Sequence, residues 1–387
     1  MPPSKGHPLR LLIVGPSWVG DVVMATPAIR LIRRCLPGCF IGALVRPGLD
    51  DVLAGTSDVD EMHVARSSGV MGPKFVAGKV RPRRYDTALL LTNSFSTALI
   101  TRLAGIPRRI GYDRDARGLL LTDRLRAPTR PDGRYAPVPA IEYYLRLACE
   151  ALLGRAVPDW RAGGHPMRME ITPEQEESSA VLLDRSGVGR EAPLAVLNPG
   201  GNDPAKRWPA ERFAVLAEHL ARGHGLCVAI NGSPAEADLA FAIRSGVSVD
   251  FRDRVVSLPE HGVTLASLKG ILRRARVVVT NDTGPRHMAA AVGARLVTLF
   301  GPTDHRWTTI PTRAGSPEAI LMSDPTLPPD LVADDHPDRC RIDRIPVEDV
   351  LDAADRQLAG WEGPIVAEAS GFSGGLAPRV SEPGRSA

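Results

Sequence analysis

The segment LLIVGPSWVGD, residues 11–21, sets the fold class of this chain of 387 residues. Four apolar residues end at a Gly-Pro turn, and a helical pattern runs from there to about Arg34. A short apolar strand, a glycine-rich turn and a helix make up the βα unit from which parallel sheets are built. The segment therefore predicts an α/β protein whose first strand is Leu11–Val14.

The same alternation of strand and helix continues along the chain and is interrupted once. In the first half we expect strands at 40–45 and 86–91, a helix that ends near Ala104 and another at 141–153. A polar stretch between about 157 and 189 has one short helix after Thr172-Pro173 and predicts a linker. After it we expect strands at 194–197, 227–230, 276–280 and 295–300, with helices at 209–222, 234–245, 264–274, 285–292 and 347–358.

This organisation predicts two Rossmann-like domains that face each other across a cleft. The predicted divisions are an N-terminal domain at 1–160, a linker at 161–190, a C-terminal domain at 191–345 and a final helix at 346–361. Residues 362–387 are rich in Gly, Ser and Pro, a composition typical of disordered tails. Ligands of such folds bind beyond the carboxyl ends of the strands, so the loops at those ends form the candidate site.

Composition excludes several classes of protein. With 43% hydrophobic and 24% charged residues the chain has an ordinary globular composition, and its net charge of +4 is too small to indicate nucleic-acid binding. Its five cysteines are scattered without a CxxC pair, which favours a reducing cytosol over a disulfide framework or a structural zinc site. No apolar run approaches the roughly 18 residues that cross a bilayer, and the run at 11–14 is too short for a signal peptide.

The first candidate residue is Asp21, at the start of the first predicted helix. Gly15 and Gly20 have the spacing of a phosphate-binding loop, but Asp21 stands where such loops carry lysine, and a carboxylate would repel a phosphate. An acid at a helix N-terminus lies in partial positive charge that favours its ionised form. Asp21 is therefore either a general base that accepts a hydroxyl proton or a structural acid that binds a backbone N–H.

The second candidate is Lys206, in the loop NPGGNDPAKRWP at residues 198–209. The chain has only five lysines among its 48 basic residues. A loop of small residues between a strand and a helix is suited to hold an anion, and a lysine there would place a compact positive charge on a phosphate. The alternative is an ordinary solvated lysine.

The third group of candidates follows the strand in VVVTNDTG, residues 277–284. The backbone N–H groups of Thr283 and Gly284 would point outward as an anion site, and Asp282 could bind sugar hydroxyls. The alternatives are an N-cap acid with a structural glycine and, in the helix that follows, a packed His287. A fourth corner, FGPTD at 300–304, is expected to close the same pocket.

Positive charge is concentrated in one part of the N-terminal half. Residues 81–130 contain 11 Arg and 4 Asp, an excess of +7. Solvated arginine faces are common, but arginines also bind phosphorylated or carboxylated groups, and long basic faces favour anionic membranes. Two DxD triplets, at 58–60 and 113–115, follow no clear strand, so we predict no metal site.

Four motifs in a fixed order give the chain a family resemblance. They are GPSWVGDVVMATP at 15–27, TNS at 92–94 followed by AGIPRRIGY at 104–112, NPGGNDPAKRWP at 198–209, and TNDTGPRHMAAAVG at 280–293 followed by LFGPTD at 299–304. In this order and spacing they resemble the ADP-heptose:lipopolysaccharide heptosyltransferases of glycosyltransferase family 9, and most closely the heptosyltransferase II branch. The resemblance covers roughly residues 10–355.

The resemblance implies a GT-B fold and an inverting, metal-independent transfer of heptose from ADP-heptose to the lipopolysaccharide inner core, with no cofactor. The acceptor would be of the Kdo-lipid A type, and the enzyme would be cytoplasmic and peripheral at the inner face of the inner membrane, with no nucleic-acid partner. Asp21 would be the general base and Lys206 would neutralise the diphosphate. The implied donor-binding residues are Gly201, Asn202, Asp282, Thr283, Gly284 and His287, and the implied acceptor-side residues are Ser17, Trp18, Gly20, Asn93 and Ser94.

The sequence departs from the family pattern at two places and leaves three other functions open. The segment at 93–96 is neutral where many heptosyltransferase II sequences carry a basic residue, and Cys340 stands alone in a segment that is often cysteine-rich. A family-9 transferase with another sugar donor or envelope acceptor would fit the same residues. A nucleotide-sugar 2-epimerase can share the architecture and would act without an acceptor. A binding protein without activity is disfavoured by the joint presence of Asp21, Lys206 and Asp282.

Overall fold

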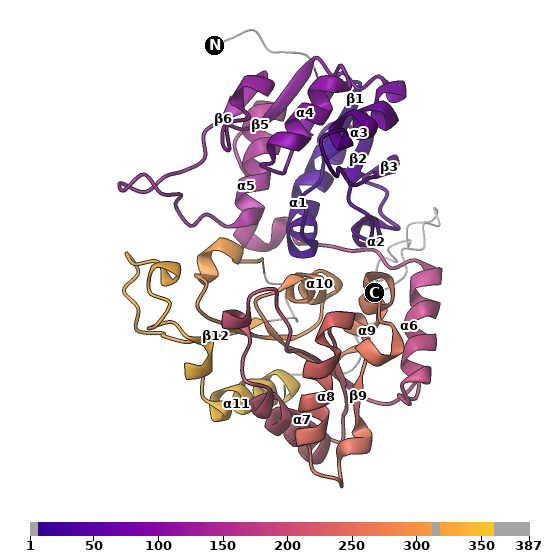
Figure 1. Ribbon diagram of the computed structural model, residues 1–387, viewed down its shortest axis with the longest axis vertical. Helices are drawn as coiled ribbons and strands as arrows, with labels where there is room; N and C mark the ends of the chain where they lie inside the picture. The colour runs from indigo at the N-terminus through magenta and orange to yellow at the C-terminus, as the bar shows by residue number, and fades with distance from the viewer. Residues whose placement is uncertain (1–6, 312–317, 360–387) are drawn as a thin grey trace, which may run out of the picture.

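The computed structural model describes residues 7–311 and 318–359, which form two lobes, one above the other in Figure 1. Each lobe is built around a parallel sheet of six strands with helices packed on it. The predicted α/β architecture of two Rossmann-like units is confirmed.

The N-terminal sheet has the strand order β3-β2-β1-β4-β5-β6. Its strands are β1 (Arg10–Val14), β2 (Phe40–Val45), β3 (Glu61–Val64), β4 (Thr87–Leu90), β5 (Arg108–Tyr112) and β6 (Asp123–Leu125). Its helices are α1 (Val19–Cys35), α2 (Asp50–Leu53), α3 (Gly72–Val80), α4 (Phe95–Leu103) and α5 (Ala140–Arg146), and α5 continues as a π-helix at Leu147–Leu153. In β1, Leu11 and Ile13 pack into one buried cluster and Leu12 and Val14 into another, so both faces of this sheet are covered.

The C-terminal sheet has the strand order β12-β11-β10-β7-β8-β9. Its strands are β7 (Leu194–Asn198), β8 (Cys227–Ile230), β9 (Val255–Ser257), β10 (Val277–Asn281), β11 (Leu296–Phe300) and β12 (Glu318–Met322). Its helices are α7 (Ala210–His224), α8 (Ala237–Gly246), α9 (Leu265–Arg274), α10 (Gly284–Val292) and α11 (Val347–Ala359). Between the lobes, α6 (Pro173–Arg185) lies in the segment predicted as a linker.

The linker helix is tied to both lobes by polar contacts. The hydroxyl of Ser179 in α6 donates a 2.6 Å hydrogen bond to the carbonyl of Ser267 in α9. Lys269 of α9 is fully buried, and its ammonium donates to the carbonyl oxygens of Ala54 at 3.3 Å and Glu170 at 2.8 Å. One lysine therefore joins the N-terminal lobe, the linker and the C-terminal lobe.

The two lobes also share one hydrophobic cluster, because α1 and α10 pack against each other. Val22 and Met24 of α1 are buried in the same cluster as Met288 and Ala291 of α10. This contact places the first turns of the two helices side by side. Those first turns carry four residues of the predicted site, Gly20, Asp21, Gly284 and His287.

The structure adds strands that the sequence pattern did not predict, namely β3, β5, β6, β9 and β12. Four of these lie at sheet edges. The helix predicted at 141–153 is α-helical only to Arg146 and then widens to the π form. The tail predicted to be disordered, 362–387, lies outside the described residues.

Candidate active site between the lobes

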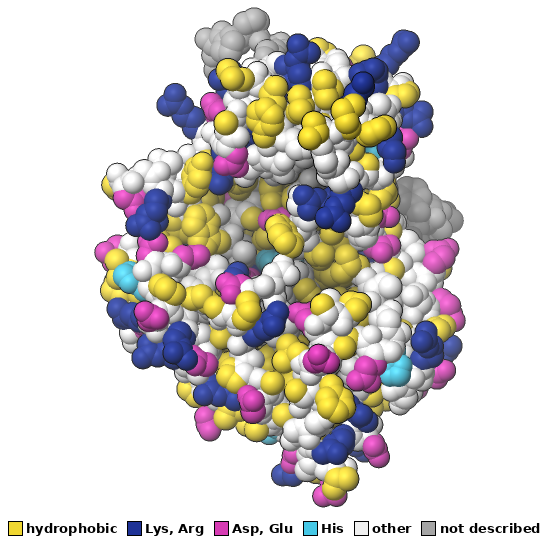
Figure 2. Space-filling view, viewed as in Figure 1, with side chains coloured by type: hydrophobic (Ala, Val, Ile, Leu, Met, Phe, Trp, Pro, Cys, Tyr) yellow, Lys and Arg dark blue, Asp and Glu magenta, His cyan; other side chains and the backbone are white. Residues whose placement is uncertain are grey.

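A cavity of about 260 Å³ lies between the two lobes. Figure 2 shows the surface hollowed where the lobes meet. Residues of the N-terminal lobe line most of the cavity, half of them small or aliphatic and half polar or aromatic, and two residues of the C-terminal lobe complete it. The polar and aromatic ones are Asp21, Asn93, Arg114, Tyr135, Tyr143 and Tyr144, and the two from the C-terminal lobe are Trp307 and Thr308.

Asp21 lies in this cavity, in the first turn of α1. Its Oδ1 accepts a 3.0 Å hydrogen bond from the hydroxyl of Tyr144. Burial raises the pKa of Asp21, the bond from Tyr144 lowers it, and the negative charge of Asp282 raises it further. Burial is the largest of these three influences, and it opposes the ionised form that a helix N-terminus favours. A raised pKa makes the carboxylate a stronger base.

Asp282 follows β10 and is held by groups of its own lobe. Its Oδ1 accepts hydrogen bonds from the hydroxyl of Thr308 at 3.1 Å and from Arg286 at 3.2 Å. Arg286 is fully buried and forms two further bonds, of 2.7 and 3.1 Å, with the carboxylate of Glu318 in β12. Burial alone would lower the pKa of Arg286, but the two carboxylates outweigh it and raise that pKa. Asp282 is thus fixed at the cleft, within electrostatic reach of Asp21.

The first turns of α1 and α10 approach each other through two glycines. A Cβ placed on Gly20 would lie 2.5 Å from Cδ2 of His287, and one placed on Gly284 would lie 3.0 Å from Cβ of Val19. Because helix N-termini carry free N–H groups and partial positive charge, their convergence favours an anion nearby. His287 is buried, and burial together with the charge of Arg286 lowers its pKa well below the usual value. The described residues give its Nδ1 no hydrogen-bond partner.

The loop after β7 lies beside the start of α10. A Cβ placed on Gly201 would lie 3.6 Å from Cγ2 of Thr283, and the N–H of Gly201 donates a 2.9 Å hydrogen bond to Glu236. Asn202 is exposed. Lys206 is half-buried, and across 7–311 and 318–359 its ammonium has no ion pair or hydrogen bond. The loop therefore meets the start of α10 at Gly201 and carries, five residues later, a cation that has no partner in the described ranges.

Asn93 is the predicted acceptor-side residue that lines the cavity. Its side-chain oxygen accepts hydrogen bonds from the hydroxyl of Tyr143 at 3.1 Å and from Arg117 at 2.9 Å. Arg117 is fully buried, and its guanidinium also donates to the carbonyl groups of Thr92 and Tyr112. These bonds hold the amide of Asn93 in one orientation at the cavity wall.

The other predicted acceptor-side residues are not among those that line the cavity. Ser17 and Ser94 are half-buried, Trp18 is 62% exposed, and Gly20 lies under the ring of His287. The basic stretch at 81–130 contributes Arg114, whose guanidinium stacks on the ring of Tyr135 at 3.7 Å. Arg114 is therefore the member of that stretch placed to meet a cavity ligand.

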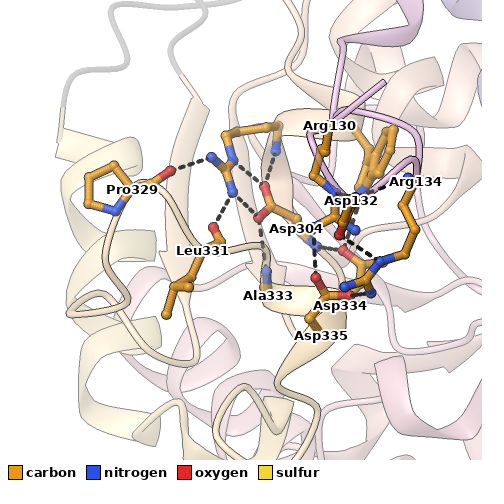
Figure 3. A network of polar contacts seen from close by, with 11 residues as sticks. Arg130, Asp132, Arg134, Asp304, Pro329, Leu331, Ala333, Asp334 and Asp335 are labelled. Atoms are coloured by element: carbon orange, nitrogen blue, oxygen red, sulfur yellow. Dashed lines mark hydrogen bonds and ion pairs between the residues drawn. The ribbon is translucent and has the colours of Figure 1, made fainter. Parts of the chain in front are cut away.

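A network of ion pairs crosses from one lobe to the other beside the cavity (Figure 3). Arg130 and Arg134 lie on the segment 127–139 of the N-terminal lobe, which also lines the cavity through Pro128 and Tyr135. Their guanidinium groups bind the carboxylate of Asp335 at 2.7 and 2.6 Å. The network holds this segment against the C-terminal lobe.

The fourth predicted corner anchors the same network. The carboxylate of Asp304 binds Arg306 and the N–H of Ala333; burial opposes ionisation, but these bonds prevail and lower the pKa of Asp304 to about 2. Asp334 accepts from the N–H of Asp304 at 2.8 Å and from the indole of Trp307 at 3.1 Å. Asp304 itself does not line the cavity, but it fixes the turn that places Trp307 and Thr308 at the cavity wall.

Sequence reasoning missed three residues that shape the site: Tyr144, Thr308 and Arg286. Tyr144 is 123 positions from Asp21 and has no local signal that could reveal the contact. Arg286 stands four residues after Asp282 in a helix, a spacing that favours an ion pair and could have been noticed. In the described residues, the group of three side chains close enough to share a metal ion lies elsewhere, on α7 and α11. No described helix is long and apolar enough to cross a bilayer.

Comparison with known proteins gives a consistent result. A family model described as glycosyltransferase family 9 (heptosyltransferase) matches residues 76–326. Lipooligosaccharide heptosyltransferase 2 of Haemophilus influenzae is 30% identical over 308 residues, which are 78% of this chain and 85% of that protein. Lipopolysaccharide heptosyltransferase 2 of Escherichia coli is 29% identical over 306 residues, with the same coverage.

Solved structures show the same fold. The structure of E. coli ADP-heptose lipopolysaccharide heptosyltransferase II superimposes with a TM-score of 0.73 at 24% identity, over 90% of this chain and 98% of that one. A family 9 glycosyltransferase from Veillonella parvula superimposes with a TM-score of 0.77 at 21% identity, over 92% and 98%. The predicted GT-B arrangement is confirmed by these matches.

Proposed function

Since this chain belongs to glycosyltransferase family 9, the heptosyltransferases, we propose that it transfers heptose from ADP-heptose to the lipopolysaccharide inner core. The transfer inverts the anomeric carbon and uses neither a metal ion nor another cofactor. The observation that carries the proposal is the buried carboxylate of Asp21 in the interlobe cavity, facing the Asp282 corner of the opposite lobe.

Asp21 acts as the general base. An acceptor hydroxyl attacks the anomeric carbon on the face opposite the diphosphate, the bond from that carbon to the diphosphate oxygen breaks, and ADP leaves. The hydroxyl proton passes to Asp21, whose pKa is raised by burial and therefore suits it for this step. Tyr144 orients the carboxylate through its bond to Oδ1 and leaves Oδ2 to take the proton.

The C-terminal lobe binds the donor. Lys206 neutralises the diphosphate together with the N–H groups of Thr283 and Gly284, because charge that develops on the leaving group is stabilised by fixed donors. Gly201 and Asn202 line the same turn, and Asp282 holds heptose hydroxyls while Arg286 and Thr308 keep it in place. His287 supports this arrangement by packing against Gly20 across the interface.

The N-terminal lobe binds the acceptor. Asn93 and Arg114 offer hydrogen-bond donors at the cavity wall, and the rings of Tyr135 and Tyr143, with that of Trp307 from the opposite lobe, offer flat surfaces for sugar rings. The guanidinium of Arg114 matches the carboxylate of a Kdo-type sugar. Gly20 permits the close helix contact, and we assign Ser17, Trp18 and Ser94 to the acceptor side only through the family resemblance. These features suit an anionic inner-core acceptor.

We further propose that the N-terminal lobe docks on the inner face of the inner membrane. Its exposed large apolar side chains gather on and near α3 and α4, where Figure 2 shows them among basic side chains. They include Val70, Met71, Phe75, Phe95 and Leu119, with Lys74 and Lys79 beside them. Apolar insertion together with anionic attraction is the usual requirement for peripheral binding. Sedimentation with phosphatidylglycerol vesicles, and much less with phosphatidylcholine vesicles, is the expected result, and F75S should weaken it.

The first experiment is to measure ADP release from ADP-heptose with Kdo-lipid A, with heptosyl-Kdo-lipid A and with no acceptor. ADP that forms only with an acceptor, and equally with EDTA present, is the expected outcome, and the better acceptor identifies which heptose is added. Conversion of the nucleotide sugar without any acceptor would favour the 2-epimerase. Donor binding without turnover on either acceptor would favour another envelope acceptor.

The matched pair D21N and D51N tests the base. Both acids lie in the first turns of helices of the N-terminal lobe, and burial raises the pKa of both, but only Asp21 lines the cavity. Loss of a general base lowers the rate by about 10²–10⁴-fold. We expect this loss for D21N with ADP-heptose binding retained, and wild-type turnover for D51N. Equal turnover of D21N and wild type would remove Asp21 from the mechanism.

A further inference from the structure

Two histidines and one aspartate converge on the outer side of the C-terminal lobe. His219 lies in α7 and His224 is its last residue, while Asp355 lies in α11. The Nε2 atoms of both histidines lie close to the same oxygen, Oδ1 of Asp355, at 2.7 and 2.8 Å. The side chains are 30%, 31% and 42% exposed, so solvent and ions can reach them.

In the described ranges no lysine or arginine forms an ion pair with the carboxylate of Asp355. Its partners are the two imidazoles. Burial raises the pKa of Asp355, but the hydrogen bonds from the imidazoles outweigh burial and lower that pKa. Arg356 follows Asp355 in sequence but pairs with Asp352, and Arg222 lies between the two histidines in sequence but pairs with Glu218. A carboxylate between two imidazoles, with no lysine or arginine bound to it, is a donor set that attracts a divalent cation.

We propose that His219, His224 and Asp355 bind Zn²⁺ or a similar borderline transition-metal ion and that water completes its coordination. Two imidazole nitrogens and one carboxylate oxygen are ligands that zinc, cobalt, nickel and copper prefer over magnesium or calcium. The three ligand atoms already lie within 4.8 Å of one another. Tetrahedral ligands at about 2.0 Å from zinc stand roughly 3.3 Å apart, so binding lengthens each His–Asp distance by about half an ångström and brings the two imidazole nitrogens to the same separation.

The ion would join α7 to α11. These helices already pack together on the second sheet, where Val350, Ala353 and Ala354 of α11 are buried in the same cluster as Phe213 and Leu216 of α7. None of the three ligands lines the interlobe cavity. The site is therefore a structural clamp on the donor-binding lobe, and it leaves the metal-free transfer reaction unchanged.

Calorimetric titration of the full, untagged chain with ZnCl₂, and with MgCl₂ for comparison, tests the proposal. We expect one equivalent of zinc to bind in the micromolar range or tighter, no comparable binding of magnesium, and a higher Tm with zinc than with EDTA. H219A, H224A and D355N should each weaken zinc binding by about ten-fold or more. H261A, which changes a histidine of the same lobe outside the cluster, should bind zinc as wild type does. Cobalt absorption in the visible range reports whether the geometry is tetrahedral.

Two results would overturn the site. One is the absence of zinc binding to the folded wild-type chain at tens of micromolar. The other is equal zinc binding by wild type and H224A, which would assign the ion to the free cysteines or other groups. H224A changes an exposed side chain at a helix end, so it keeps the test decisive if D355N fails to fold. Transferase activity enters neither measurement, so the site stands or falls separately from the proposed reaction.

Discussion

Replacing Tyr144 with phenylalanine tests the role of Asp21 without changing the carboxylate itself. Y144F removes one oxygen, the hydroxyl that donates a 3.0 Å hydrogen bond to Oδ1 of Asp21, and leaves the buried ring in place. That bond lowers the pKa of Asp21 against the opposing effect of burial. Its loss therefore raises the pKa of Asp21.

The size of the effect follows from the energy of the lost bond. A hydrogen bond to a charged group contributes about 1.5–3 kcal/mol, and about 1.4 kcal/mol corresponds to one pH unit. A carboxylate acts as a base only when it is ionised. Because the pKa of Asp21 is higher in Y144F, protonation of Asp21 stops turnover at a higher pH in the variant. The acidic limb of kcat/KM is expected to move upward by about 1–2 pH units, with a similar rate on the plateau above it.

The assay is ADP release under kcat/KM conditions across the acidic and neutral range for wild type, Y144F and Y143F. Y143F is the matched control, because Tyr143 also lines the cavity but its hydroxyl binds Asn93. We expect Y143F to raise the KM for acceptor and to leave the acidic limb in place. A Y144F profile that superimposes on the wild-type profile, or an equal displacement in Y143F, would refute the assignment of the limb to Asp21.

Three further changes have expected outcomes. K206A should raise the KM for ADP-heptose by about 10–100-fold in steady-state kinetics, because it loses one charge-assisted bond, and the control K74A should leave that KM unchanged. Equal KM values for K206A and wild type would remove Lys206 from the donor site. D335N removes the charge that pairs with Arg130 and Arg134 across the lobes, so kcat/KM should fall a few-fold at low salt and converge with the wild-type value at high salt. Parallel salt dependences of kcat/KM in the two proteins would contradict this. Burial lowers the pKa of Lys269 to about 8 from 10.5, so the folded state disfavours its charge below that pH. As pH rises from about 8 to 10.5, urea unfolding should show wild type gaining up to about 3 kcal/mol relative to K269M, and a pH-independent difference would be inconsistent with a lowered pKa.

All central strands except β5 could be predicted from the sequence and the edge strands could not, and the difference has a physical reason. Strands β1, β7, β10 and β11 are buried on both faces, so they appear as continuous apolar runs between turn residues. An edge strand is paired on one side only and needs fewer apolar residues. The edge strand β3 alternates between half-buried and exposed residues, and β6 consists of Asp-Arg-Leu. Neither segment differs from a loop in composition.

The corners of the site could be predicted because they follow predictable strands, whereas their partners could not. Asp282 comes directly after β10, and Asp21 lies in the first turn of α1, after the glycine-rich turn that follows β1; a polar residue is conspicuous at such a helix start. Tyr144 and Thr308 reach them from other segments, and nothing local marks a tyrosine or threonine as a partner of an acid far along the chain. Gly20 has the spacing of a phosphate-loop glycine, but in the structure its missing side chain makes room for the ring of His287 from the other lobe.

The charges around the cleft explain why the proposed base, Asp21, and the proposed diphosphate-binding cation, Lys206, lie on different loops. One buried cation, Arg286, stands between Asp282 and Glu318, so that group keeps a net negative charge. In the described ranges no cation pairs with Asp21, and burial together with this negative charge raises its pKa and favours proton uptake. Uptake of the acceptor proton relieves the repulsion between the two acids. The same negative charge would repel a diphosphate, so in the proposed reaction the leaving group needs a cation apart from the acids, the part that we propose for Lys206 in the loop after β7.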